Sequence, residues 1–359
     1  MKSTLRVARI GRGDGGRWYW LCGCMAAMFL HCATAQDSPS LPDGDARPAL
    51  IAPKAAQTRL LDIARAGAHL VAVGQHGVIL RSEDGAQWRQ VESPVGVMLT
   101  RVRFTDPLSG WALGYDASIL QTVDGGRTWA LRHRDTDGHA LYDLLFFDPR
   151  HGLAVGAYGS MLSTRDGGAS WTAMDPPLAE LGMHLNAVIA LGDASLLVVG
   201  ERGLMARSVD QARTWTLIDG PYAGSLFGGM AMGAGAALVH GMRGNVYVAD
   251  DLAHCPPIAA DAWDPYARST VTDREALAAL GWRRLDSPVQ ESLFGALRLN
   301  GQGVLLVGVN GTALSWDGAG TALQIVKTAA AETLTRALSF NGRLIAVGRR
   351  GVEDLGPLQ

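Results

Sequence analysis

Charge is scarce in this sequence, and its sign excludes one common class of partner. Lys, Arg, Asp and Glu make up 18% of the 359 residues. Residues 1–35 hold five basic residues against Asp14, a net charge of +4, and the rest of the chain holds 27 basic and 33 acidic residues, a net charge of −6. Nucleic-acid-binding proteins usually carry a basic surface. We therefore expect no nucleic acid among the partners.

Cysteine nearly disappears once a signal peptide is taken into account. Residues 1–17 are basic, residues 18–30 are apolar apart from Gly23, and residues 33–35 (Ala-Thr-Ala) are small where a signal peptidase cleaves. The apolar run is too short to span a bilayer. We expect a signal peptide at 1–35, no membrane span, and a periplasmic or secreted mature chain. Only Cys255 then remains, which excludes an intrachain disulfide.

The motifs of common enzyme and metal sites are also missing. The eight histidines after residue 35 never stand at an H-x-x-x-H spacing, and the sequence has no G-x-S-x-G and no Walker loop. The glycines at 228, 229, 233 and 235 do not form a dinucleotide fingerprint. We therefore expect no metal, no cofactor and no catalytic residue.

Glycine, in contrast, is abundant and recurs at a regular spacing. It accounts for 45 of 359 residues, about 12.5%, against the usual ~7%. An apolar phrase that closes on glycine occurs seven times, and the spacings between successive closing glycines are 40, 42, 44, 41, 67 and 40. In six of the seven phrases another glycine follows three residues later, giving G-x-x-G. A period of about 40 residues with short glycine-bounded strands is typical of a propeller blade. The closing glycines are Gly74, Gly114, Gly156, Gly200, Gly241, Gly308 and Gly348.

A second motif follows the third strand of the first four repeats. Thr122-x-Asp124-Gly-Gly-x-Thr128-Trp129 is the clearest copy, and it has the form of an Asp-box, or BNR repeat. In such a turn the aspartate accepts backbone N–H bonds, glycine provides a positive φ, and tryptophan packs beneath. The predicted structural residues are Asp84, Trp88, Asp124, Trp129, Asp166, Trp171, Asp210 and Trp215.

Together the two motifs predict an all-β fold, a seven-bladed β-propeller of four-stranded antiparallel blades over residues 56–359. Residues 334–355 supply only three strands, so we expect Ala49–Ala52, in an N-terminal linker at 36–55, to add the fourth strand and close the ring. The fifth blade has an insert at about 251–281. There, Thr272 and Glu275 form a capping box before a short helix that Gly281 ends. The blades are expected at 59–94, 99–134, 141–177, 184–221, 226–288, 293–330 and 334–355.

Two blades carry a further phrase before the closing glycine, Phe104-x-Asp106-Pro-x-x-Gly-Trp and Phe147-Asp148-Pro-x-x-Gly. With these motifs, residues 56–355 resemble the photosystem II stability/assembly factor-like branch of the BNR-repeat propellers. The resemblance is carried by blades one to four and weakens in blades five to seven, where Ser315-x-Asp317-Gly lacks the tryptophan. It implies a non-catalytic propeller that assists assembly of a membrane photosystem. Similar secreted propellers often occur beside resistance-nodulation-division exporters, so the implied partner is a membrane-protein complex or such an exporter.

The propeller topology predicts where a binding face would lie. The G-x-x-G turns and the starts of the innermost strands share one face, and the Asp-boxes lie on the opposite face. Arginine combined with aromatic residues is the usual composition of interaction hot spots. We expect a monomer that binds its client through this face. The predicted binding residues are Arg202, Arg243, Arg336, Arg349, Arg350, Arg101, Tyr115, Tyr142, Tyr158, His184 and Glu201.

The alternative is a glycan-active protein, because sialidases and other glycosidases also contain Asp-boxes. A glycosidase needs two carboxylates, or a Tyr–Glu pair as in sialidases, around the scissile bond. Of the eight glutamates after residue 35, only Glu201 lies in a predicted central turn, and the Arg-Ile-Pro phrase of sialidases is absent. A sialidase-like hydrolase or a glycan-binding protein is therefore the alternative to the scaffold. Small-ligand sensing in the central channel has no specific residue behind it.

Overall fold

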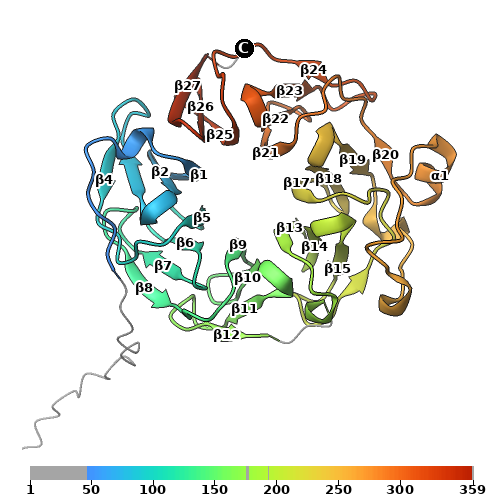
Figure 1. The fold of residues 1–359 in the computed structure, drawn as a ribbon, viewed down its shortest axis with the longest axis horizontal. Coiled ribbons are helices and arrows are strands. Elements are labelled where there is room, and N and C mark those ends of the chain that lie inside the picture. Colours follow the sequence, from blue (N-terminus) through green and yellow to red (C-terminus); the bar gives the residue numbers. More distant parts are fainter. Residues whose placement is uncertain (1–46, 175–177, 193, 358–359) are drawn as a thin grey trace, which may run out of the picture. The chain divides into compact units, whose positions relative to one another are not determined.

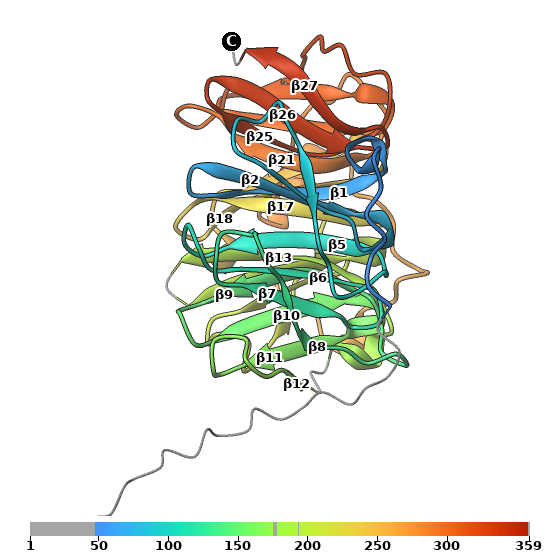
Figure 2. The same cartoon turned by 90° about the vertical axis from the view of Figure 1, so that its left-hand side faces the viewer.

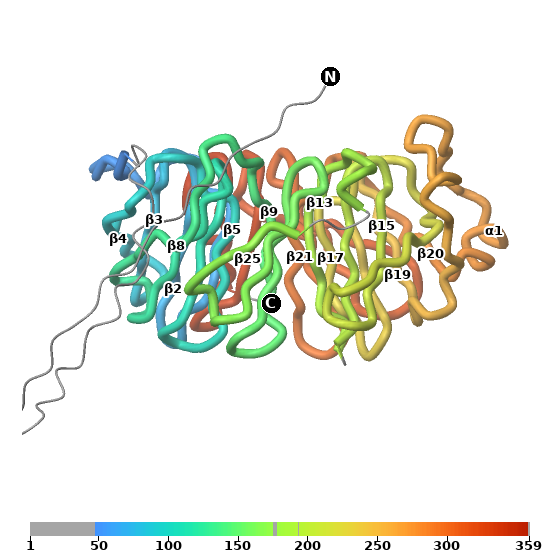
Figure 3. Tube along the Cα trace, turned by 90° about the horizontal axis from the view of Figure 1, so that it is seen from below, coloured from blue at the N-terminus to red at the C-terminus, as the bar shows by residue number. Residues whose placement is uncertain are grey.

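The computed structural model describes residues 47–174, 178–192 and 194–357, so the predicted signal peptide at 1–35 and residues 36–46 of the linker lie outside the described residues. Residues 41–359 form one compact unit. In it, seven antiparallel sheets are arranged around a centre, and their strands run between two opposite faces (Figures 1 and 3). This confirms the predicted seven-bladed β-propeller. None of the described helices has the length and apolar character that a membrane crossing requires.

Six blades have four strands and the seventh has three, in chain order across each sheet. Blade one consists of β1 (Leu60–Ala66), β2 (His69–Gly74), β3 (Ile79–Ser82) and β4 (Arg89–Val91). Blade two consists of β5 (Leu99–Phe104), β6 (Gly110–Gly114), β7 (Ile119–Thr122) and β8 (Ala130–His133). Blade three consists of β9 (Leu141–Phe146), β10 (Gly152–Gly156), β11 (Met161–Thr164) and β12 (Thr172–Ala173). Blades four and five are formed by β13 (Leu185–Gly192), β14 (Ser195–Gly200), β15 (Met205–Ser208), β16 (Thr216–Leu217); β17 (Leu226–Gly233), β18 (Ala236–Gly241), β19 (Val246–Ala249) and β20 (Arg283–Arg284). Blades six and seven are formed by β21 (Leu293–Arg298), β22 (Val304–Gly308), β23 (Ala313–Trp316), β24 (Gln324–Ile325); β25 (Leu334–Phe340), β26 (Arg343–Gly348) and β27 (Gly351–Pro357).

The described helices are short. One α-helix, α1 (Arg274–Ala279), lies in the blade-five insert. The remaining helices are single 3-10 turns: η1 (Ala55–Gln57), η2 (Gln75–Gly77), η3 (Ala157–Gly159), η4 (Ala179–Leu181), η5 (Glu201–Gly203), η6 (Met242–Gly244), η7 (Leu252–His254), η8 (Ala260–Ala262) and η9 (Val309–Gly311).

The core consists of apolar layers between neighbouring blades. Seven hydrophobic clusters each combine side chains from two adjacent blades. The cluster between the last blade and the first contains Phe340 and Ile345 from blade seven and Leu60 and Ile63 from β1. Figure 2 shows β25 and β26 beside β1 and β2. Face-to-face packing of blade seven on blade one therefore closes the ring, as it joins every other pair of sheets.

The repeated closing glycine has a steric cause. A Cβ on Gly200 would collide with the carbonyl oxygen of His184, the residue just before β13. The other six closing glycines meet the carbonyl oxygen that precedes their own innermost strand in the same way. The backbones of the first and second strands therefore approach so closely at this point that no side chain fits, which explains the period seen in the sequence.

The predicted closing strand is wrong. Residues 49–52 form no strand, and blade seven keeps three strands. The segment lies against the rim of blade one instead: the N–H of Ala52 donates to Oε1 of Gln90 at 2.8 Å, and Nε2 of Gln90 donates to the carbonyl oxygen of Leu50 at 2.9 Å. Pro48 and Pro53 flank the segment, and proline has no N–H for a strand ladder.

What the N-terminal segment does supply is the linker into blade one. In the six other blades the linker to the next blade crosses close to the turn after the second strand, as Val95 does at Gly77. In blade seven the corresponding Gly351, at φ +90°, faces the carbonyl oxygen of Ala56 in η1. Residues 55–57 thus occupy the place of the missing linker, although the segment before them does not extend the sheet.

The blade-five insert contains the expected helix with a different cap. Oδ1 of Asp273, rather than Thr272, accepts the N–H of Ala276 at 2.9 Å, because Asp273 occupies the N-cap position. Gly281 follows the helix at φ +78°, as expected of a C-cap glycine. Leu277 packs into the core between blades four and five, which holds the insert against the rim.

The four aspartate turns connect the third and fourth strands of blades one to four. In the second of them, Oδ1 of Asp124 accepts the N–H groups of Arg127 and Thr128 at 2.9 and 3.0 Å. Gly126 in this turn leaves no room for a Cβ against Val71, so the turn packs on the preceding blade. Trp129 and Trp171 are buried, and Trp88 and Trp215 are partly buried. These turns lie at the opposite end of the blades from the G-x-x-G turns.

Candidate binding face

The G-x-x-G turns and the starts of the innermost strands meet on one face, which we call the turn face. The N–H of Gln75 donates to the carbonyl oxygen of Arg59 at 3.0 Å, and so joins the turn after β2 to the residue before β1. The equivalent hydrogen bond occurs in all seven blades, at 2.8–3.0 Å. Each blade therefore brings its turn and its strand start together at one mouth of the central channel, as the sequence predicted.

A β-bulge near the start of every innermost strand turns one side chain into this mouth. The register shifts between the first leucine of the strand and the residue two positions later, for example between Leu60 and Asp62. The residue between them is the one that the bulge leaves unpaired. The seven such residues, one from each blade, line a cavity of about 450 Å³: Leu61, Thr100, Tyr142, Asn186, Phe227, Phe294 and Thr335.

Blades three and four place an aromatic group at the edge of this mouth. The ring of His184 lies 4.7 Å from that of Tyr158 and 5.9 Å from that of Tyr142. The backbone N–H of Tyr158 donates to Nδ1 of His184 at 3.1 Å, which assigns the proton of the neutral imidazole to Nε2. Oε2 of Glu201 lies 3.9 Å from the same Nδ1. The structure thus brings together four predicted residues, and a fifth, Tyr115, is exposed in the corresponding turn of blade two.

Several arginines on the turn face have guanidinium groups without a carboxylate partner among the described residues. Arg202 stacks over the ring of Tyr266, 4.4 Å from its centroid. Arg59 and Arg243 form no ion pair with a described residue. The guanidinium of Arg349 is 64% exposed and lies 3.6 Å from Glu332. Arg350 is exposed beside it and lines a second cavity over blade seven. The turn face therefore carries more positive than negative charge around its aromatic residues.

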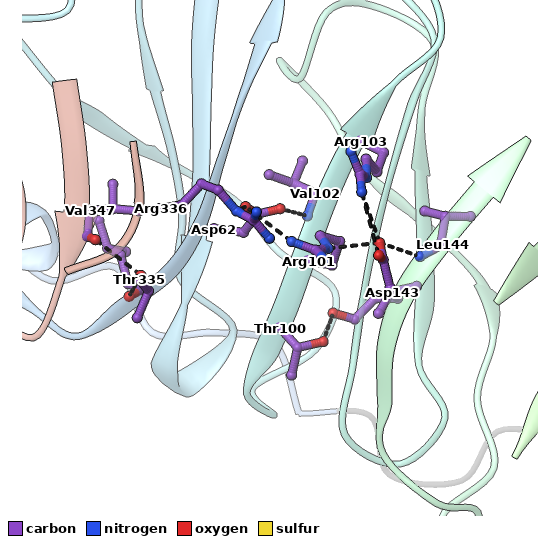
Figure 4. Close-up of polar contacts among 12 residues, drawn as sticks. Asp62, Thr100, Arg101, Val102, Arg103, Asp143, Leu144, Thr335, Arg336 and Val347 are labelled. Atoms are coloured by element: carbon purple, nitrogen blue, oxygen red, sulfur yellow. Dashed lines mark hydrogen bonds and ion pairs between the residues drawn. The ribbon is translucent and has the colours of Figure 1, made fainter. Parts of the chain in front are cut away.

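Two predicted arginines lie differently from the prediction. Arg101 is only 6% exposed: its Nε donates to Asp143 at 2.8 Å, and its Nη1 lies 3.7 Å from Asp62 (Figure 4). Nε of Arg336 donates to Asp62 at 3.0 Å. The side chains of Arg101 and Arg336 extend into the channel, because each residue follows the bulge of an innermost strand that runs along the channel. Their charges are balanced there by carboxylates, and Arg101 is not presented on the surface.

This ion cluster lies between the mouth and a larger cavity of about 870 Å³ on the other side of the channel, because Arg101 and Arg336 line both. Asp143 is 1% exposed and also accepts the N–H groups of Leu144 and Val188 at 2.8 and 3.2 Å. Burial opposes its ionisation, but the guanidinium groups of Arg101 and Arg103 outweigh burial and hold the pKa of Asp143 below its usual range. Asp62 differs, because burial outweighs the charges of Arg101 and Arg103 there and raises the pKa of Asp62 above its usual value. The cluster ties blades seven, one, two and three together.

The aromatic group lacks the pair of carboxylates that most glycosidases use, since Glu201 is its only carboxylate among the described residues. Tyr142 and Tyr158 lie in the same group, so the residue types of a sialidase-like Tyr–Glu pair are present. Among the described residues, no three His, Cys, Asp or Glu side chains gather as metal ligands would. Burial raises the pKa of Cys255 to about 11, so the thiol stays protonated at neutral pH.

Sequence reasoning missed the ring of bulge residues as a set, although its signal was present. Every innermost strand begins with a leucine that is at most 1% exposed, and the residue after that leucine enters the mouth. The register shift that turns the residue inward has no marker of its own in the sequence. Leu61, Thr100 and Thr335 therefore went unrecognised beside the more conspicuous Tyr142.

Comparison with known proteins agrees with this architecture. The family model for photosynthesis system II assembly factor YCF48 matches residues 80–140 and 134–262, which together span 183 of the 359 residues. Similar solved structures include YCF48 bound to D1 peptide, with a TM-score of 0.63, 17% identity, and coverage of 89% of this chain and 97% of that chain. YCF48 from Cyanidioschyzon merolae has a TM-score of 0.62 and 16% identity, over 85% of this chain and 97% of that chain.

The WD40 β-propeller domain of Doa1 is similar in fold alone, with a TM-score of 0.60 and 10% identity over 88% of this chain and 96% of that chain. No curated protein matches. The resemblance read from the glycine phrases and the aspartate turns is thus supported by a family model that covers half of the chain. The chain belongs to the YCF48 family of photosynthesis system II assembly factors.

Proposed function

We propose that this chain is a non-catalytic scaffold that holds a segment of a membrane-protein client on its turn face. The observation that carries the proposal is the mouth, where all seven blades contribute a side chain to one cavity edged by arginines and aromatic rings. A mouth lined in this way could accept an extended polypeptide segment that enters with one end first. Arginine and aromatic anchors around a central pocket are the usual energetic centre of a protein interface.

The charge of the turn face defines the client segment. Arg59, Arg202 and Arg243 have no carboxylate partner within ion-pair distance among the described residues, so an acidic segment would find unused donors there. Phe227 and Phe294, whose rings lie 5.0 Å apart, give the mouth an apolar wall. We propose an acidic client segment with at least one apolar side chain. The similar structure of YCF48 with a D1 peptide supports a peptide of a membrane protein as the kind of client.

The location of the mature chain belongs to the same proposal. Signal cleavage after Ala35 would release the chain into the periplasm, or the lumen of a photosynthetic host, where extracytoplasmic segments of a membrane complex or a resistance-nodulation-division exporter are accessible. Cell fractionation and N-terminal sequencing test this step directly. A mature chain that begins at Gln36 in the periplasmic fraction supports it, and an unprocessed cytoplasmic chain contradicts it.

The client proposal is tested by reversing charge on one face at a time. The signal-processed protein is mixed with detergent-solubilised host membranes, and captured membrane proteins are quantified for the wild type and for the triple variant Arg202→Glu, Arg243→Glu, Arg349→Glu. A matched triple variant, Arg127→Glu, Arg165→Glu, Arg213→Glu, changes three exposed arginines in the aspartate turns of the opposite face.

We expect the first variant to lose the client at least tenfold, because each buried interfacial charge pair that is broken costs about 2–5 kcal/mol, and we expect the control to retain it. Equal recovery by both variants contradicts the proposal. Turnover of a sialoside or glucan panel that disappears on changing Glu201 or Tyr158 would establish the glycan-active alternative instead.

A further inference from the structure

A cavity of about 590 Å³ lies at the turn-face end of blade five, away from the central mouth. Its walls come from four parts of the chain: the loop before β17, the η6 turn, the blade-five insert, and the residues at and after β20. Two arginines line it, Arg243 from η6 and Arg284 from β20, and none of its lining residues is acidic. Neither arginine has an ion pair with a described residue.

The blade-five insert forms one wall of this cavity. The N–H of Val271 donates to the carbonyl oxygen of Pro221 at 2.8 Å, and the N–H of Ala223 donates to Oγ1 of Thr270 at 3.3 Å. The guanidinium of Arg268 is anchored on Asp219 at 2.9 Å. The insert is therefore fastened to the loop that lines the cavity, and the other blades, which lack an insert, have no equivalent wall.

Hydrogen-bond donors exceed acceptors inside this cavity. Tyr222 donates its hydroxyl to the carbonyl oxygen of Met242 at 3.0 Å, and the amide of Asn245 is bonded on both sides, so these groups are already satisfied. Thr270 accepts a backbone N–H and keeps its own O–H to donate. The side-chain amide of Gln290 has no partner among the described residues.

The strongest unused donor is Arg284. Its Nε is buried and has no hydrogen-bond partner in the described part of the chain. Tyr222, Arg243 and Arg284 line the same cavity. Burial raises the pKa of Tyr222, and the positive charges of the two arginines oppose that rise. Two cations that share a partly buried cavity without a carboxylate repel each other, and a bound anion would remove that cost.

We propose that this cavity binds the phosphate or carboxylate group of a small molecule, held between Arg243 and Arg284 with Thr270 and Gln290 as neutral donors. An oxyanion is the ligand that matches the site, because it only accepts hydrogen bonds and the two guanidinium groups of the site only donate them. The volume leaves room for a body of sugar size beyond the anionic group. The site shares Arg243 with the client proposal, but Arg284, Thr270 and Gln290 lie only in this cavity and not at the central mouth. Loss of anion binding in Arg284→Gln with client capture retained therefore separates the two proposals.

Calorimetric titration of the mature protein in low-salt buffer tests the site with four probes: inorganic phosphate, glucose 6-phosphate, glucuronate and glucose. We expect saturable 1:1 binding of at least one anionic probe and none of glucose. Binding of the phosphate probes only identifies a phosphate group as the ligand, and binding of glucuronate only identifies a carboxylate. Added salt should weaken the interaction, because part of it is electrostatic.

Variants locate the binding. Arg284→Gln and Arg243→Gln should each weaken binding of the probe about tenfold or more, because each removes a charge-assisted hydrogen bond and one positive charge from the site. Thr270→Val should weaken it less and leaves both charges in place. The control Arg213→Gln removes an exposed arginine from the opposite face and should bind like the wild type.

The thermal unfolding midpoint of each variant shows whether it is folded. If Arg284→Gln does not fold, the exposed Arg243 together with Thr270→Val decides the matter. Absence of saturable binding for all three anionic probes, or binding that Arg243→Gln leaves unchanged, overturns the proposal.

Discussion

Acidification should destabilise this propeller through His240. The imidazole is fully buried: Nδ1 lies 2.9 Å from the carbonyl oxygen of Leu293, and Nε2 faces Gly228 without a hydrogen-bond partner in the described part of the chain. Burial, helped by the charge of Arg101, lowers the pKa of His240 to about 4. An unfolded chain binds the proton near pH 6.5. The stability that neutral His240 provides is therefore complete above about pH 6.5 and is lost as the pH falls toward 4.

The size of the effect follows from the same two values. A difference of about 2.5 pKa units at 1.36 kcal/mol per unit gives a loss of about 3 kcal/mol between neutral pH and pH 4. This is a large share of the about 5–15 kcal/mol that stabilises a typical domain. Urea unfolding at several pH values measures the free energy of unfolding directly.

His240→Leu removes the titrating group, so its free energy of unfolding should fall about 3 kcal/mol less than that of the wild type over this pH range. His254→Gln is the matched control, because it removes an imidazole that is 81% exposed instead of buried. A lower stability of His240→Leu at neutral pH does not affect the test, because only the change of the free energy of unfolding with pH is compared. Equal slopes for His240→Leu and the wild type would refute the reasoning.

Three further substitutions test the structural basis of the fold. Asp143→Asn should lower the free energy of unfolding by about 3–5 kcal/mol, because it leaves buried guanidinium groups short of a carboxylate; urea unfolding beside the exposed control Asp137→Asn measures this, and a loss under about 1 kcal/mol contradicts it. Gly200→Ala should cost about 1–3 kcal/mol through overpacking, and thermal unfolding should show no such loss for Ser195→Ala in the same strand. His76→Gly, at φ 58°, should stabilise the protein by up to about 1 kcal/mol by relieving a left-handed backbone; an unchanged or lower midpoint would count against strain at this turn.

The blades could be predicted from the sequence because their cause is local and repeated. Each closing glycine is required by a close approach of two strands within one blade, so the same residue recurs at the blade period. The ion cluster could not be predicted in this way. Asp62 accepts the N–H of Val102 across 40 residues, and Arg101 donates to Asp143 across 42, and every ion pair of the cluster joins different blades. Arg101 was accordingly expected on the surface and is buried.

The closure of the ring also could not be predicted correctly from the sequence. The expectation of a fourth strand for blade seven rested on symmetry, whereas the local sequence between Pro48 and Pro53 is unsuited to a strand ladder. Blade seven nevertheless matches the other blades at the turn after its second strand. Ala56 lies against Gly351 there, as the linkers lie against the corresponding turns of the other blades. β27 is the outer edge of a three-stranded blade. The ring is closed by the apolar layer between blades seven and one.

The turn face also carries backbone strain where a binding surface would need side chains. Tyr158, Arg202 and Arg243 each adopt φ between 51° and 55°, one position before a glycine that adopts φ of 67–75°. A non-glycine residue in this region costs roughly 1–2 kcal/mol, and glycine would avoid that cost. The chain has glycine next to these positions but tyrosine or arginine at them. Tyr158 packs against His184, Arg202 stacks on Tyr266, and Arg243 lines the cavity at blade five. Among the described residues, seven of the eleven non-glycine residues with a positive φ lie in the turns of this face, and the other four, Ala194, Gln211, Ala212 and Asn341, lie at the opposite end of the blades. Strain that recurs at the same turn position in successive blades is the pattern found at functional sites, where side-chain placement outweighs stability. It favours the turn face over the opposite face as the surface on which this propeller acts.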